Sequence, residues 1–92
     1  MDLINAHKSF WKENDYPYIK VVEIPEAELI QLITKLSRTD VIEWLIWNDR
    51  NGVYSDESSI REFGKAMSIE EGIEIMLRQA EENRVVTHWK VV

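Results

Sequence analysis

Residues 41–47 have the sequence VIEWLIW, and the predicted fold depends on how this stretch is interpreted. The stretch is short and nearly all apolar, and the polar run NDRNG follows it at 48–52. A short apolar run bounded by turn-forming residues is typical of a buried strand. The pair Asn51-Gly52 then favours a tight hairpin into a short strand at Val53-Tyr54, because both residues accept a positive φ.

Two further segments have the composition of strands. Tyr16–Ile24 and Val85–Val92 are rich in aromatic and β-branched residues, which suit extended backbone. Pro17 is tolerated only at the start of the first of these strands. The chain is therefore expected to contain four strands.

The other apolar segments have helical periodicity. Helices are expected at Leu3–Glu13, Pro25–Ser37, Asp56–Phe63 and from Ser68 onward. Asp56 or Ser59 is the candidate cap of the third helix, and Gly64 is a natural stop for it. Ser68 and Glu71 have the spacing of a reciprocal capping box. Ile60, Phe63 and Met67 are expected to face the core.

This order of elements predicts an α+β fold. It matches the ferredoxin-like βαββαβ sandwich, with a four-stranded, mainly antiparallel sheet and an extra N-terminal helix. The 92 residues form a single domain, in which the helix occupies 1–14 and the α+β core occupies 16–92. Because the strand at 41–47 is apolar on both sides, the second sheet face needs a cover. The candidates are the N-terminal helix, a second copy of the chain or an apolar ligand.

Composition excludes several classes of function. The net charge of −6 argues against nucleic acid and anionic membranes as partners. The absence of cysteine rules out disulfides, thiolate catalysis and cysteine-based metal sites. His7 and His88 lack metal-ligand spacing, so neither a metal nor a cofactor is expected. No secretory or membrane-spanning run is present, which predicts a cytoplasmic protein.

Aromatic and acidic residues provide the candidates for partner binding. Trp is enriched at protein interfaces, although core packing also accounts for the four tryptophans. Residues 56–83 carry −5 of the net charge, which suits either a solvated helix face or a docking surface for a basic partner. The candidate residues are Trp44, Trp47, Glu70, Glu74 and Glu81.

Three functions follow from these features. The leading hypothesis is a non-enzymatic interaction or regulatory module that binds a protein partner or forms a homodimer. The first alternative is a small enzyme or apolar-ligand binder of the dimeric α+β barrel type, with Tyr18, His88 and Trp89 at its pocket. The second alternative is an acidic inhibitor or immunity-type protein that binds a basic partner.

Overall fold

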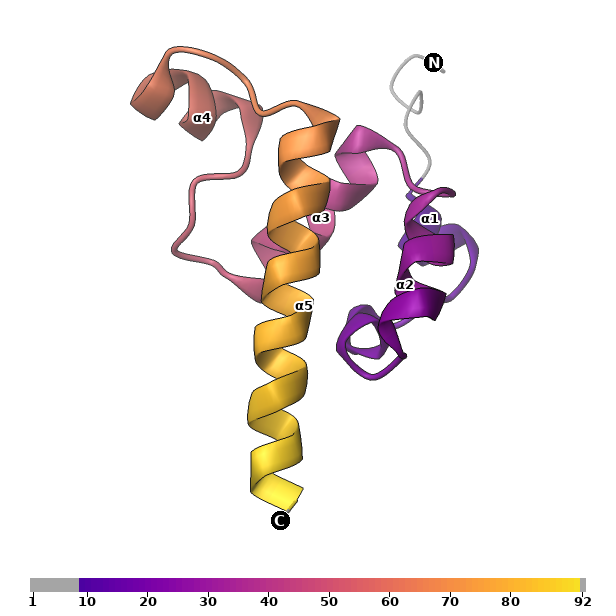
Figure 1. The fold of residues 1–92 in the computed structure, drawn as a ribbon. Coiled ribbons are helices and arrows are strands. Elements are labelled where there is room, and N and C mark those ends of the chain that lie inside the picture. The colour runs from indigo at the N-terminus through magenta and orange to yellow at the C-terminus, as the bar shows by residue number, and fades with distance from the viewer. Residues whose placement is uncertain (1–8, 92) are drawn as a thin grey trace.

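The structure, a computed structural model, describes residues 9–91, with side chains described as far as Arg84. The described residues are helical and contain no β-strand (Figure 1), so the predicted α+β ferredoxin-like sandwich is wrong. The elements are α1 (Phe10–Glu13), the 3-10 helix η2 (Tyr18–Val22), α2 (Glu26–Ile33), α3 (Arg38–Asn48), α4 (Asp56–Phe63) and α5 (Ile69–Val91).

The long helix α5 lies at the centre of the described structure (Figure 1). Its first half packs against α3, while α1 and α2 lie to one side of it and α4 lies to the other (Figure 1). With 23 residues, α5 is about 35 Å long, and its C-terminal part extends beyond the other helices. No helix within residues 9–91 combines the length and the apolar character needed to cross a membrane.

The stretch at 41–47, predicted to be a strand, belongs to α3 because a capping box opens the helix three residues earlier. The Ser37 hydroxyl accepts from the Asp40 amide at 3.1 Å, and the Asp40 carboxylate accepts from the Ser37 amide at 2.9 Å. Val41, Trp44 and Leu45 then recur at helical spacing and are buried. The apolar run is short because the first turn of the helix is polar.

The other two predicted long strands are also helical. Within Tyr16–Ile24, η2 is held by hydrogen bonds from the Lys20 amide to the Pro17 carbonyl (3.1 Å) and from the Glu23 amide to the Lys20 carbonyl (3.0 Å). Of the predicted strand Val85–Val92, the described residues 85–91 continue α5, and Val92 lies outside the described residues. No glycine or proline follows Gly72, so nothing in the sequence ends the helix earlier.

The predicted hairpin at Asn51-Gly52 is absent, and Val53-Tyr54 is irregular. Gly64, not Gly52, is the glycine with a positive φ in the described chain. Glycine is needed at 52 for a different reason, because a Cβ atom there would lie 2.2 Å from Cε2 of the Tyr54 ring. The residue therefore allows close packing of backbone against an aromatic ring.

Several helix predictions are confirmed. Helix α4 has the predicted bounds, with Gly64 at a φ of 82° as its C-cap, although Ser55 and not Asp56 or Ser59 is its N-cap. The Ser68–Glu71 capping box is present, with amide-to-side-chain distances of 2.9 and 3.1 Å. Helix α2 lies within the predicted range, and α1 lies within Leu3–Glu13, of which residues 3–8 are outside the described residues.

An aromatic cluster joins α1 and η2 to α3. The ring centroid of Trp11 lies 5.4 Å from that of Tyr18, which in turn stacks on Trp47 at 5.3 Å. The buried indoles of Trp11 and Trp44 donate to the carbonyls of Asp40 and Tyr18, both at 3.0 Å. Burial of these rings is therefore accompanied by satisfied indole N–H groups.

A chain of hydrogen bonds joins α3, the following connection and α5. The side-chain nitrogen Nδ2 of Asn83 donates to Asn48 Oδ1 at 2.9 Å, and Asn48 Nδ2 donates to Gln79 Oε1 at 2.8 Å. Gln79 Nε2 donates to the Tyr54 hydroxyl at 2.8 Å, and that hydroxyl donates to Asp49 Oδ2 at 2.9 Å. We call these five residues the amide chain.

Candidate functional site

The two tryptophans predicted to form a partner surface have different environments. Trp44 is fully buried between α3 and η2, where core packing accounts for it. Trp47 is 40% exposed and stacks on Tyr18. The two residues therefore do not form one exposed surface.

The predicted ligand-pocket residues are distributed over two elements. Tyr18 lies in η2 and borders a hollow of about 420 Å³, together with Trp11, Tyr16 and Pro17. His88 and Trp89 lie in the last turns of α5, and their side chains are outside the described part of the structure. Residues 9–91 contain no sheet, so the α+β barrel to which this pocket belongs is absent from them.

The Tyr18 hydroxyl is held by a carboxylate. It donates to Glu43 Oε2 at 2.6 Å, and the Ser9 hydroxyl donates to the same carboxylate at 3.0 and 3.1 Å. Burial and this hydrogen bond raise the pKa of Tyr18 to about 12. The contact ties η2 to α3 and keeps the phenol protonated in the folded state.

This raised pKa predicts a loss of stability at alkaline pH. The unfolded chain releases the Tyr18 proton near the ordinary tyrosine pKa of 10, whereas the folded chain keeps it until about 12. The stabilising contribution of this group is thus complete below pH 10 and falls as pH rises from 10 to 12. The free energy of unfolding, measured with urea between pH 10 and pH 12, should fall more steeply with pH for the wild type than for Tyr18→Phe. Equal slopes of the two variants would contradict the prediction.

A groove lies between α4 and α5, and we call it the α4–α5 groove. Its volume is about 400 Å³. Its apolar lining consists of Val53, Phe63, Ala66, Met67 and Ile75, and its polar lining consists of Ser59, Lys65, Glu71 and Glu74. One wall is therefore the end of α4, the other is the first half of α5, and the two connecting segments supply the rest.

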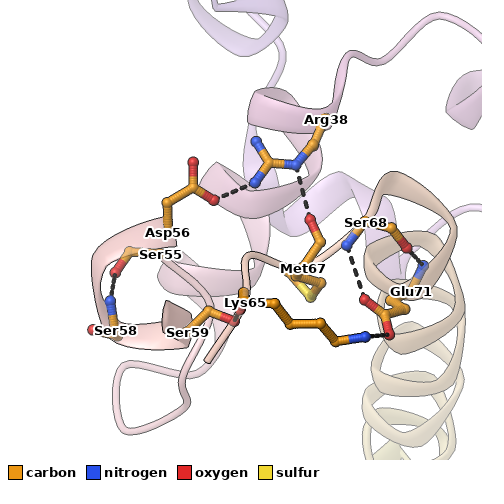
Figure 2. A network of polar contacts seen from close by, with 9 residues as sticks. All are labelled: Arg38, Ser55, Asp56, Ser58, Ser59, Lys65, Met67, Ser68 and Glu71. Carbon is orange, nitrogen blue, oxygen red and sulfur yellow. Dashed lines mark hydrogen bonds and ion pairs between the residues drawn. The ribbon is translucent and has the colours of Figure 1, made fainter. Parts of the chain in front are cut away.

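Arg38 and Ser59 connect the segments that form the groove (Figure 2). The Arg38 guanidinium pairs with Asp56 at the start of α4, and its Nε donates to the Met67 carbonyl at 2.8 Å. The buried Ser59 hydroxyl donates to the Lys65 carbonyl at 2.9 Å. Helix α4 is thus tethered to the 64–68 connection by polar contacts, and its apolar side chains are not used for this.

The apolar side chains of α4 are largely exposed. Phe63 is 67% exposed and Ile60 is 54% exposed, so the prediction that both face the core is wrong, whereas Met67 is buried as predicted. The physical reason is the position of α4, which lies apart from α1 and α2 across α5 and buries only Ser59 (Figure 1). Exposed large apolar groups beside a groove are typical of an interaction surface.

The segments that form the groove are acidic, and Glu71 and Glu74 line it. Residues 56–74 contain six acidic and two basic residues, a net charge of −4. Both basic groups are in ion pairs, Arg61 with Glu57 at 3.3 Å and Lys65 with Glu71 at 3.7 Å. The side chain of Glu74 forms no hydrogen bond or ion pair with any residue of the described chain. The segments that form the groove therefore carry a net negative charge.

The structure separates the predicted acidic candidates. Glu74 lines the groove, and Glu70 lies one helical turn before it on the same stripe of α5. Glu81 is nearly two turns beyond Glu74, about 10 Å along the helix, and does not line the groove. Hydrogen bonds with the backbone amide of Ser68, and the charge of Lys65, lower the pKa of Glu71, so this rim group is ionised at neutral pH.

Sequence reasoning missed the connection between Arg38 and the groove. Its two partners are 18 and 29 residues away along the chain, and no local pattern indicates either contact. The described residues contain no group of three or more histidine, cysteine, aspartate or glutamate side chains placed to hold a metal ion. Comparisons of the chain with protein-family models, curated proteins and solved structures found no match.

Proposed function

We propose that this chain is a protein-interaction module that binds a basic, partly apolar segment of a partner protein in the α4–α5 groove. The observation that carries the proposal is an open apolar groove whose rim is acidic. An apolar anchor in such a groove gains free energy by leaving water, and complementary charge at the rim selects the partner.

A basic partner is favoured over a second copy of this chain. The exposed face of α4 is apolar, but it is flanked by Glu57 and Glu62, which a second copy would bring toward a groove that Glu71 and Glu74 line. Like charges brought together in an interface are repulsive. The net charge of −6 adds to this repulsion at every orientation.

The proposal is tested with two synthetic peptides of about 14 residues, a length of about four helical turns, made of leucine, lysine and alanine. The helix-patterned peptide has leucine at positions i, i+3, i+4 and i+7, and the alternating peptide has the same composition with leucine and lysine in alternation. Backbone amide NMR shifts of the full chain are recorded with each peptide at low salt. We expect shifts centred on Phe63, Met67 and Ile75 that weaken as salt is added. If neither peptide produces shifts at the groove, the proposal is wrong.

Reversing one rim charge should weaken binding. Glu74→Lys is expected to reduce the affinity for the helix-patterned peptide about fivefold to tenfold, because it replaces an attraction with a repulsion at the rim. Glu81→Lys makes the same change in net charge on the same helix outside the groove and serves as the matched control. Isothermal titration of both variants measures the difference. Equal losses would indicate a general effect of net charge and no contact at the groove.

Removing the apolar wall should also weaken binding. Phe63→Ala is expected to lower the affinity about tenfold, since aromatic anchors contribute strongly to interfaces. The fold should tolerate the change because the side chain is 67% exposed. Ile30→Ala is the control, because Ile30 is also exposed but lies on α2, away from the groove. Similar affinities of the two variants would contradict a role for Phe63.

A further inference from the structure

The walls of the groove restrict the conformation of a bound segment. A bound peptide must satisfy its backbone N–H and C=O groups once water is excluded from them. An extended peptide usually does this by pairing with the edge of a sheet, and residues 9–91 contain no strand. The walls that line the groove are the helices α4 and α5, whose backbone groups bond within their own helices. These walls therefore favour a segment that forms its own backbone hydrogen bonds.

The acidic rim has the repeat of a helix. Glu70 and Glu74 are four residues apart on α5, which places them about 6 Å apart along its axis. Two basic residues at positions i and i+4 of a bound helix have the same spacing. Arg78 follows at the next position of the stripe and ends the acidic row, so the basic end of the ligand is expected beside Glu70 and Glu74.

From these two observations we propose that the partner segment is a basic amphipathic α-helix, which lays its apolar face into the α4–α5 groove and pairs basic residues one turn apart with Glu70 and Glu74. This inference rests on the proposed function, since it specifies the occupant of the same groove. The helix contributes apolar anchors against Phe63 and Ile75 and leaves its opposite face in water.

The test compares the two peptides of equal composition with the full chain. The helix-patterned peptide is expected to bind about tenfold more tightly, because the alternating peptide cannot place its leucines on one face of a helix. Circular dichroism of the mixture, after subtraction of the free protein, should show that the bound peptide gains helix. A third peptide with the helical pattern but glutamate in place of lysine should not bind.

The outcomes separate the two proposals. Binding of the alternating peptide with equal or higher affinity would overturn the helical ligand and leave the interaction module in place. Binding of neither peptide would overturn both. Sedimentation of the free protein is measured in parallel, and a dimer that Phe63→Ala dissociates would mean that a second copy occupies the groove, which also overturns the proposed ligand.

Discussion

Replacing Trp44 by alanine is expected to lower the free energy of unfolding by about 3–5 kcal/mol, as is typical of buried tryptophans. The side chain is fully buried, so its removal leaves a cavity between α3 and η2. It also removes the donor that Trp44 Nε1 provides to the Tyr18 carbonyl at 3.0 Å. Because domains of this size are stable by about 5–15 kcal/mol, a large part of the molecules would unfold in mild urea.

Trp47→Ala is the matched control for this variant, because it removes the same side chain from the same helix. Trp47 is 40% exposed and loses mainly its stacking on Tyr18, so we expect a cost of about 1 kcal/mol. Urea unfolding followed by circular dichroism measures both variants. If Trp44→Ala costs no more than Trp47→Ala, Trp44 is not part of the core as described.

Asp40→Ala is expected to cost about 2–4 kcal/mol, combining the loss of a cap with two unsatisfied amides. Asp40 is only 4% exposed. One carboxylate oxygen accepts from the Phe10 amide at 3.0 Å, and the other accepts from the Ser37 amide at 2.9 Å. The variant thus weakens the start of α3 and one of the contacts that hold α1 to it, while the bond from the Trp11 indole to the backbone carbonyl of residue 40 is kept.

Hydrogen exchange distinguishes these two losses. In Asp40→Ala the amide of Phe10 should exchange faster than in the wild type, in addition to the lower global stability. Asp56→Ala is the control, since its ion pair with Arg38 is partly exposed and such pairs contribute at most about 1 kcal/mol. A global loss without faster exchange at Phe10 would show that the α1 contact is not carried by Asp40.

The sequence predicts the helices that have clear boundaries and mispredicts those that do not. For α4, Gly64 stands at the helix end and the amphipathic pattern is short, so both bounds could be predicted. For α3, the apolar run was assigned by its length and composition, although Ser37 and Asp40 have the spacing of a capping box. Giving that pair priority over β-branched content would have predicted the helix. The final segment fails similarly, because valines suggest a strand where no residue interrupts α5.

The candidate site could be predicted only in part. The acidic character of α5 and the position of Glu74 are visible in the sequence, because charge and helical register are local properties. Burial is not local: Trp44 and Trp47 have the same chemistry and both contact Tyr18 of η2, yet Trp44 is fully buried and Trp47 is 40% exposed. The α4–α5 groove depends on Arg38 contacts that span 18 and 29 residues, which local patterns do not indicate.

The hydrogen bonds of the amide chain all run from donor to acceptor in one direction, and the charge of Asp49 determines that direction. The carboxylate of Asp49 can only accept, so the single proton of the Tyr54 hydroxyl is committed to it and the phenol oxygen must accept from Gln79. Gln79 then turns its carbonyl to Asn48, which turns its own carbonyl to Asn83. In Asp49→Asn the side chain at 49 could donate as well as accept, so the donors and acceptors of the chain could be arranged in either order. The charge of Asp49, at the end of α3, therefore determines which groups donate and which accept at the three neutral side-chain amides on α3 and α5.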